Sequence, residues 1–368
     1  MKIAILGTRG IPNYHGGFEQ FAEHFSVHMA NKGHDVFVYN SHNHPYQEKA
    51  FKGVNIVHQS DPENKVGTFG QFIYDLNCIK DARKRGLDVI LQLGYTSSSI
   101  WGKLLPKKAV IVTNMDGLEW KRSKYSKPVR WFLKIAEKLA INTSDYLISD
   151  SVGIRSYIEE KYGSSSEFIP YGADLFTKPD LKIVKEYGLD SFGYDMLIAR
   201  LEPENNIDVI LEGVANSDGT KPFLVIGKHE TKYGEYLKDK FSENKNIRFF
   251  GGIYNQNHLD NLRYFSNIYF HGHSVGGTNP SLLEAMASNA FIVANDNVFN
   301  KSILNDEAFY FKNSEDVAKL LQLKKDDYIE LGSKNQDKIA SLYSWDRINE
   351  HYENYLLNCF KEFNKGIS

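Results

Sequence analysis

Short apolar runs alternate with helical hydrophobic patterns along the first half of the chain. In the segment from Phe18 to Met29, apolar residues recur three or four positions apart, which is the spacing of one helix face. Continuous apolar strands separated by helices are typical of a parallel sheet that helices cover on both faces. We therefore predict a doubly wound α/β domain with strands at Ile3–Leu6, Val36–Tyr39, Val54–Val57, Val89–Leu93, Val110–Val112 and Tyr146–Ile148.

The same alternation starts again after a turn-rich segment around Pro170 and Lys178, so we predict a second doubly wound domain. Its strands are expected at Tyr194–Ala199, Phe223–Ile226, Ile247–Phe250, Ile268–Phe270 and Phe291–Ala294. Two such domains facing a cleft would bind ligands at the carboxyl ends of their strands. A last amphipathic helix carries Ile348, Tyr352, Tyr355, Leu356 and Phe360.

Length and composition agree with two globular domains, because 368 residues exceed what one hydrophobic core usually serves. The net charge of -2 gives no general attraction to nucleic acid. Cys78 and Cys359 can form at most one disulfide, which favours a reducing compartment. The apolar start of the chain is too short for a signal peptide, and no apolar run approaches the ~20 residues that span a bilayer. We therefore expect a cytoplasmic protein, and attachment to a membrane surface stays open.

The segment from His271 to Ala287 combines a strand end, a Gly-Gly turn and a helix start. Asn279 suits the N-cap and Pro280 the first helical position. Helix N-termini present N–H groups and a partial positive charge, so this one is suited to a phosphate or diphosphate. Glu284 follows one turn into the helix.

A long loop from Gly7 to Glu19 follows the first strand. Gly16 and Gly17 permit close backbone approach to a ligand, and the next helix begins there. The spacing is not that of a dinucleotide fingerprint. An ordinary strand-to-helix turn is the alternative, although Arg9, His15 and Glu19 favour a site.

Polar residues follow two further strands. Asp116 comes after the strand at Val110 and can contact a hydroxyl or accept a proton, or it can form a turn with Gly117. Arg200 ends the first strand of the second domain, where it can bind phosphate oxygens or make a surface salt bridge.

Two polar pairs accompany Arg200. Asn205 and Asn206 can cap the next helix. His271 and His273 point to one side of a strand, where hydrogen bonding near a sugar is favoured over metal binding.

The segment from Trp120 to Lys134 is basic and aromatic and contains no acidic residue. One interpretation is a patch that meets anionic lipid or a lipid diphosphate. The other is a solvated basic face whose aromatic residues belong to the core. The balanced overall charge makes nucleic acid the weaker candidate.

Four motifs, in order, resemble the GT-B glycosyltransferases, specifically retaining enzymes of glycosyltransferase family 4 and a bacterial rhamnosyltransferase-type subgroup. The motifs are Gly7–Pro12 with Gly16–Glu19, Asp116–Arg122 with an extra Leu118, Arg200–Asn205, and Gly276–Ala285. The resemblance covers nearly the whole chain. It implies an N-terminal acceptor domain over residues 1–175, a nucleotide-sugar domain over 176–345, and a final helix, 346–368, that packs toward the first domain.

Two positions depart from the broader family. That family pairs an Arg with a Lys five residues later, whereas Asn205 follows Arg200 here. It also has two Glu seven residues apart, of which Glu284 matches the second and Gly276 replaces the first. The first Glu would contact the donor sugar, so its replacement suggests a differently shaped sugar, such as L-rhamnose.

The resemblance implies a retaining hexosyltransferase with dTDP-L-rhamnose as the leading donor and no metal or other cofactor. The acceptor would be a polyprenyl-diphosphate-linked saccharide for capsule, O-antigen or another surface polysaccharide, at the inner face of the bacterial membrane. The alternatives are a UDP-sugar donor (GlcNAc, glucose or galactose) and a non-catalytic sugar-nucleotide-binding partner.

The site residues fall into three groups. The catalytic candidates are Asp116, Arg200 and Glu284. The donor-binding candidates are Gly16, Gly17, Arg200, Asn205, Gly276, Gly277, Thr278, Asn279, Leu282 and Glu284. The candidates for contact with acceptor or membrane are Glu19, Trp120, Lys121, Arg122 and Lys124.

Overall fold

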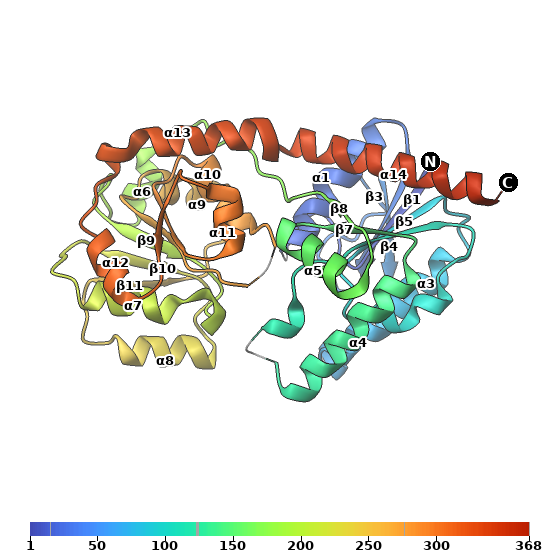
Figure 1. Cartoon of the computed structure of the whole chain (residues 1–368), viewed down its shortest axis with the longest axis horizontal. Coiled ribbons are helices and arrows are strands. Elements are labelled where there is room, and N and C mark those ends of the chain that lie inside the picture. Colours follow the sequence, from blue (N-terminus) through green and yellow to red (C-terminus); the bar gives the residue numbers. More distant parts are fainter. Residues whose placement is uncertain (15, 123–124, 276, 368) are drawn as a thin grey trace. The chain divides into compact units, whose positions relative to one another are not determined.

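The computed structural model describes residues 1–14, 16–122, 125–275 and 277–367, and it divides into two compact units (Figure 1). Unit 1 comprises Met1–Trp120, Tyr125–Tyr171 and Trp345–Ser368, and unit 2 comprises Lys121–Lys124 and Gly172–Ser344. The predicted site residues Lys124 and Gly276, and the loop residue His15, lie outside the described residues. Among the described helices, none is long and apolar enough to cross a membrane.

Unit 1 is built on a sheet in which the described residues form eight strands, ordered β3-β4-β2-β1-β5-β6-β7-β8. Neighbouring strands in this part of the structure are parallel, apart from the antiparallel pair β3 and β4. The strands are β1 (Lys2–Leu6), β2 (Asp35–Ser41), β3 (Ala50–Phe51), β4 (Val54–Gln59), β5 (Val89–Leu93), β6 (Val110–Asn114), β7 (Tyr146–Ser149) and β8 (Glu167–Phe168). Every strand predicted for this half is confirmed. The strands β3 and β8 were not predicted, because each has only two residues, too few to show a pattern.

Successive side chains of β1 face opposite layers of unit 1. Ile3 and Ile5 pack in a core with α1 (Gly17–Asn31) and α14 (Trp345–Ile367), whereas Ala4 and Leu6 pack with α3 (Phe69–Ala82). Both faces of the sheet are therefore covered, as the continuous apolar runs predict. Unit 1 also contains the helices α2 (Glu63–Val66), η1 (Ser99–Leu104), α4 (Lys127–Thr143) and α5 (Val152–Tyr162), and η2 (Glu119–Lys121) follows β6.

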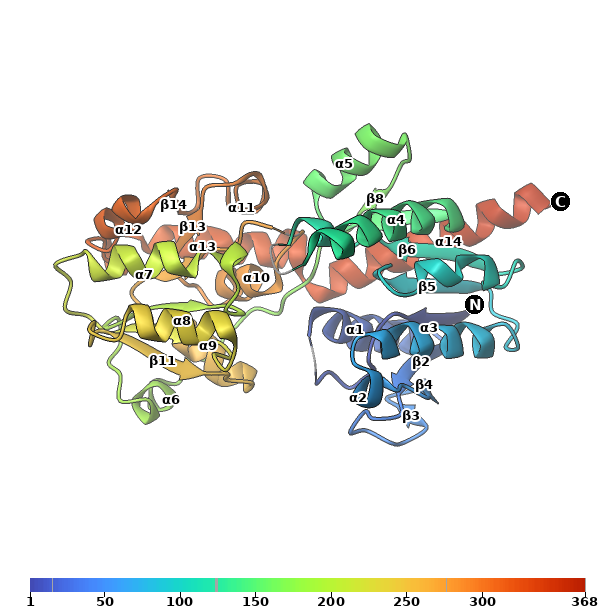
Figure 2. The same cartoon turned by 90° about the horizontal axis from the view of Figure 1, so that it is seen from below.

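The last helix, α14, belongs to the core of unit 1 and lies beside α1 (Figures 1 and 2). Its predicted apolar face is confirmed, because Ile348, Tyr352 and Leu356 are buried in the same cluster as Phe25. The resemblance to GT-B enzymes implied that the last helix packs in this way.

Unit 2 is built on a parallel sheet in which the described strands have the order β11-β10-β9-β12-β13-β14. These strands are β9 (Asp195–Ile198), β10 (Phe223–Ile226), β11 (Ile247–Gly251), β12 (Tyr269–His271), β13 (Ile292–Asn295) and β14 (Phe309–Phe311). The predicted strands are confirmed, and the short edge strand β14 is additional. The helices are α6 (Leu181–Glu186), η3 (Pro203–Asn205), α7 (Ile207–Ala215), α8 (Lys232–Lys240), α9 (Gln256–Tyr264), α10 (Pro280–Ala287), α11 (Val298–Leu304), α12 (Ser314–Leu320), η4 (Lys325–Tyr328), α13 (Ile329–Lys338) and η5 (Ile339–Tyr343).

Each sheet has a point at which the strand order reverses. In unit 1, β1 lies between β2 and β5, and in unit 2, β9 lies between β10 and β12. Ligands of open α/β sheets bind outside the carboxyl ends of the strands at such a point. The loops after β1, β9 and β12 are therefore placed where a site is expected, and each contains a predicted motif.

Candidate functional site

The loop after β12 leads into α10 with the predicted geometry. Asn279 is the N-cap, and its side-chain oxygen accepts a hydrogen bond from the backbone N–H of Ser281 at 2.9 Å. Pro280 is the first helical residue. Thr278 is buried and Gly277 is half-buried directly before the cap. The start of α10 thus places the positive end of the helix dipole directly after the Gly277–Asn279 backbone.

Arg200 follows β9 and is exposed. Burial and, next, the positive charge of Arg200 lower the pKa of His273 to about 3, so this guanidinium lies close to the loop after β12. The two loops are joined directly, because the Ser274 N–H and hydroxyl donate to the Glu204 carbonyl at 3.1 and 2.7 Å. Unit 2 therefore brings a cation and a helix N-terminus to the same end of its sheet.

Asn205 and Asn206 hold these loops in place through their side-chain amides. The buried Asn205 amide donates to the Arg200 carbonyl at 2.7 Å. Asn206 donates to the Gly272 carbonyl at 2.8 Å and makes no side-chain cap on α7. A Cβ at Gly272 would lie 2.1 Å from the Asn205 carbonyl oxygen, which explains the glycine. Asn206 thus occupies the predicted N-cap position of α7 without a side-chain cap, because its amide joins the two loops, whereas the Asn205 amide bonds within its own loop.

Glu284 is engaged by a residue that the sequence did not single out. Arg263 on α9 is 1% exposed and forms ion pairs with Glu284 at 2.5 Å and with Asp260 at 2.9 Å. Only one of the two Glu284 carboxylate oxygens, Oε2, is bonded to Arg263. The arginine therefore fixes the carboxylate and leaves Oε1 for a second donor. The spacing of Asp260 and Arg263 is common on helices, so no sequence signal marked the pair.

Leu282 is a predicted donor contact whose side chain is fully buried. Its N–H donates to the Asn279 carbonyl at 3.0 Å within the first turn of α10. The helical period turns this position toward the core. The role of Leu282 in donor binding stays a prediction.

His271 and His273 face the same side of the strand end, as predicted, and their rings stack with centroids 4.4 Å apart. Neither nitrogen of the buried His271 ring has a hydrogen-bond partner among the described residues, and the same holds for Nδ1 of His273. Burial holds the pKa of His271 well below its usual range. Two neutral imidazoles, which can exchange hydrogen bonds with hydroxyl groups, therefore lie at the end of β12.

The loop after β1 is tightly built. Glu19 is buried, and its carboxylate accepts a hydrogen bond from the Arg9 N–H at 2.9 Å. A Cβ at Gly7 would lie 2.2 Å from the Leu93 carbonyl oxygen, and at Gly10 it would lie 2.4 Å from the Asn40 side chain. Glu19 thus anchors the loop, and its contact with an acceptor or membrane stays a prediction.

The turn at the end of this loop stays accessible. Gly16 is the exposed N-cap of α1, which begins at Gly17 as predicted and has no side-chain cap. Tyr171 donates to the Gly17 carbonyl at 2.8 Å. The geometry is compatible with backbone contact to a ligand at Gly16, and the role of both glycines stays a prediction.

Asp116 is both a turn residue and a polar group at the end of β6. Its φ of 51° lies in the left-handed region, and its N–H donates to Asn114 Oδ1 at 2.9 Å. Asn114 in turn donates to the hydroxyl of Tyr352 on α14 at 2.8 Å. Asp116 is thus held in an uncommon conformation by a chain of hydrogen bonds that ends on the last helix.

A second carboxyl group accompanies Asp116. Asp150 follows β7, the neighbour of β6, and burial together with the negative charge of Asp116 raises the pKa of Asp150 to about 8. At neutral pH Asp150 holds a proton beside Asp116, a pairing suited to hydroxyl binding or proton transfer. The sequence did not single out Asp150, because the two positions meet only through strand pairing.

The described residues of the predicted patch from Trp120 to Lys134 are only partly at the surface. The half-buried Trp120 indole donates to the buried Glu137 carboxylate at 3.1 Å, and Lys134 lies over its ring at 4.5 Å. Lys121 is exposed and Arg122 is half-buried. Trp120 is therefore a packed residue, as the alternative interpretation held for the aromatics.

Comparison with protein families covers both units. Residues 1–174 match a family described as a domain of unknown function, DUF1972, and residues 195–339 match the glycosyl transferases group 1. The chain carries a group 1 glycosyltransferase domain. In this glycosyltransferase, Arg200, the loop after β12 and Glu284 all lie within the matched region. The comparison with curated proteins gives no match.

Solved structures similar to this glycosyltransferase cover almost its entire length. A sucrose-phosphate synthase from Thermosynechococcus elongatus has a TM-score of 0.79 and 15% identity, over 98% of this chain and 99% of that one. Anabaena HepE, solved with UDP-glucose, has a TM-score of 0.75 and 14% identity, over 97% and 99%. An α,α-trehalose 6-phosphate synthase from Burkholderia multivorans has a TM-score of 0.68 and 12% identity, over 100% and 99%. The predicted GT-B glycosyltransferase fold is confirmed.

Proposed function

We propose that this glycosyltransferase retains the anomeric configuration and transfers L-rhamnose from dTDP-L-rhamnose to a lipid-linked saccharide. The observation that carries the proposal is the grouping in unit 2 of exposed Arg200, the capped start of α10 and Glu284. Arg200 and the amides at Gly277–Asn279 would bind the diphosphate, and Glu284 would accept a hydrogen bond from the ribose.

The chemistry asked of these groups is electrostatic. As the bond between the anomeric carbon and the diphosphate breaks, negative charge grows on the leaving oxygen, and a fixed cation with the amides at Gly277–Asn279 would stabilise it. The acceptor hydroxyl forms the new bond from the same face and passes its proton to the leaving group or to a carboxylate. Asp116 is the proposed carboxylate, with the protonated Asp150 beside it.

L-rhamnose is proposed because Gly276 stands where the wider family has a Glu that contacts the sugar. A sugar without the 6-hydroxyl has one hydrogen-bonding group fewer for a Glu to contact. The polyprenyl-diphosphate acceptor and a place in surface polysaccharide synthesis, at the inner membrane face, follow from the resemblance to the rhamnosyltransferase-type subgroup. A UDP-sugar is the second candidate donor, because the similar structure HepE was solved with UDP-glucose.

The test is a panel of sugar nucleotides, scored by thermal shift with dTDP and UDP and by donor hydrolysis and transfer. We expect stabilisation by dTDP and turnover of dTDP-L-rhamnose. Stabilisation and turnover by UDP-sugars alone would overturn the rhamnose proposal, and binding without turnover of any donor would support a non-catalytic partner.

Arg200→Ala tests the site itself. Loss of one group that stabilises the transition state should lower kcat on the order of 10²-fold. The matched control is Arg248→Ala, an exposed arginine near the start of β11, at the opposite end of a parallel sheet from the site. Equal kinetics in both variants would remove Arg200 from the reaction.

A further inference from the structure

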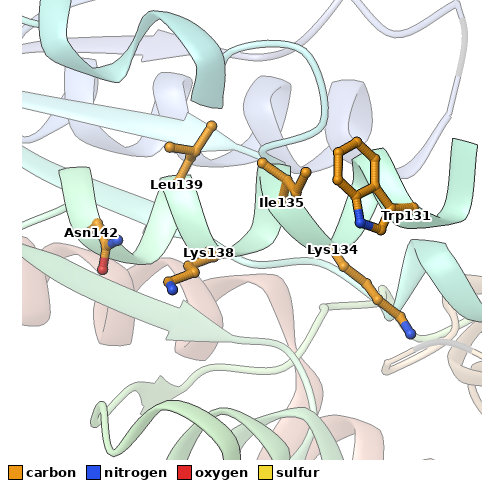
Figure 3. Close-up of a pocket in the computed structure, with 6 residues that line it drawn as sticks. All are labelled: Trp131, Lys134, Ile135, Lys138, Leu139 and Asn142. Carbon is orange, nitrogen blue, oxygen red and sulfur yellow. The ribbon is translucent and has the colours of Figure 1, made fainter. Parts of the chain in front are cut away.

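The outward face of α4 in unit 1 carries a row of apolar side chains. Trp131, Ile135 and Leu139 are four residues apart, so they lie along one side of the helix (Figure 3). Trp131 is 68% exposed, although a large indole is normally packed. With Lys134, Lys138 and Asn142 these residues line a shallow hollow of about 340 Å³.

The fold does not need this row. The opposite side of α4 supplies the core contacts, through the buried Leu133, Ala136 and Ala140. A tryptophan that makes little contact inside its own protein is free to serve an external contact.

The charges beside the row are all positive. Lys127, Lys134 and Lys138 are exposed on the same helix, and Figure 3 shows Lys134 and Lys138 next to the apolar row. The single acidic residue of α4, Glu137, is 2% exposed and binds Tyr157 and Lys161. The exposed surface of α4 thus offers cations and apolar side chains without a compensating anion.

We propose that this face of α4 docks unit 1 on an anionic lipid bilayer. A helix that lies in the membrane interface has an apolar stripe bordered by lysine, and Trp is favoured at that depth. Negatively charged headgroups complement the lysines, whereas a second copy of the same face would bring like charges together. Docking rests on the proposed function in one respect: the proposed function explains why docking is useful, since it gives access to a lipid-linked acceptor. The proposal also centres the predicted basic and aromatic patch, Trp120 to Lys134, on the part that lies in α4 and extends it to Asn142.

The experiment is flotation of the full chain with phosphatidylcholine vesicles that contain or lack phosphatidylglycerol. Each lysine at such a surface is worth about a fivefold change in affinity, so Lys134→Gln/Lys138→Gln should bind roughly 25-fold more weakly. Trp131→Ser should weaken binding roughly tenfold. Added salt should reduce binding of the parent, because screening shortens the reach of the charges.

The control variant, Lys182→Gln/Lys185→Gln on α6, removes the same charge from an exposed helix of unit 2 and should bind as the parent does. Tryptophan emission should shift to shorter wavelength on anionic vesicles in the parent and not in Trp131→Phe. Binding that is equal in the α4 and α6 variants, or equal on both kinds of vesicle, would overturn the proposal. Concentration-dependent dimers that the α4 variants abolish, without vesicle binding, would also overturn it and assign the face to a second copy.

The same preparations separate docking from catalysis. The α4 variants should hydrolyse the donor, or transfer its sugar to a water-soluble acceptor, at the parental rate. Arg200→Ala should bind vesicles as the parent does. Vesicle binding through α4 in a protein that turns over no sugar nucleotide would reject the proposed function and leave docking intact. Turnover with unchanged vesicle binding in every α4 variant would reject docking alone.

Discussion

Replacing Arg263 by Met removes the cation that joins Glu284 to Asp260 while nearly preserving side-chain volume. Arg263 is 1% exposed, whereas the two carboxylate side chains retain 18% and 17% exposure. In the variant, two carboxylates face each other with neither the guanidinium nor full hydration. We therefore expect a loss of stability in unit 2 together with a disordered Glu284.

The size of the loss follows from the burial of the three groups. Removing one partner of a buried ion pair costs about 3 to 5 kcal/mol, and the residual exposure of both carboxylates places this site at the lower end, about 3 kcal/mol. Removing the second charge as well, in Arg263→Met/Glu284→Gln, should restore about 1 to 2 kcal/mol of that loss, because the repulsion with Asp260 disappears.

The loss should depend on pH. Burial raises the pKa of Asp260, the positive charge of Arg263 lowers it, and Glu284 raises it. Without Arg263, the pKa of Asp260 in the folded state rises further. A carboxyl group whose folded pKa exceeds its unfolded value costs stability above that unfolded pKa and ceases to do so when both states are protonated. The difference between parent and variant should therefore shrink as the pH falls from neutral toward about pH 4, the ordinary pKa of the carboxyl group.

Urea unfolding can report the two units separately. The four tryptophans are Trp101, Trp120, Trp131 and Trp345, and all of them belong to unit 1. Far-UV circular dichroism follows both units, so a loss confined to unit 2 appears as an earlier dichroism transition beside an unchanged fluorescence transition. With a urea m-value of about 2 kcal/mol/M, the midpoint of unit 2 should fall by about 1.5 M.

Arg248→Met, at an exposed position of the same unit, is the control and should change the midpoint little. A loss below about 1 kcal/mol at neutral pH would show that Arg263 does not hold a pair of buried charges. A loss of the expected size that is constant from neutral pH to pH 4 would assign the effect to packing and refute the electrostatic reasoning.

Three further changes test other parts of the structure. Glu137→Gln weakens charge-assisted bonds from Tyr157, Lys161 and Trp120, so it should lower the free energy of unfolding by about 3 kcal/mol, measured by tryptophan fluorescence. Tyr157→Phe should lower it by about half as much, and equal losses would contradict a shared network. Burial lowers the pKa of Lys325 to about 7, so the unfolded chain binds more protons from about pH 7 to about pH 10 and stability should rise with pH there. Lys325→Met should reduce this rise in urea titrations, and an unchanged slope would contradict it. Asn279→Ala should cost about 1 kcal/mol through loss of the α10 cap, measured by dichroism, and no loss would show that the cap is not needed.

Local sequence patterns were enough to predict the strands, the face of α1 and the start of α10. A strand buried on both sides requires a continuous apolar run, and an Asn-Pro pair before a helical run satisfies the cap and the first turn at once. The edge strands β3, β8 and β14 were missed because two or three residues carry no period. Leu282 was predicted as a ligand contact from its place in a motif, whereas the burial of its side chain depends on how its helix packs.

The motifs also predicted loops that could carry function, since the polar residues Asp116 and Arg200 follow apolar strands. Their partners could not be found in this way. Arg263 reaches Glu284 from another helix, and Asp150 reaches Asp116 from the next strand of the sheet.

For this protein, the sequence by itself determined the two α/β sheets, the glycosyltransferase motif after β12 and the residues that can hold charge there. These features depend on residues that are close to one another in the sequence. The tertiary structure alone decided which charges are paired, which glycines are sterically required and which aromatic residue of the basic segment is exposed. Burial and pairing are set by residues distant in sequence, so Trp120 became a packed residue and Trp131 a surface one although both lie in the same basic stretch.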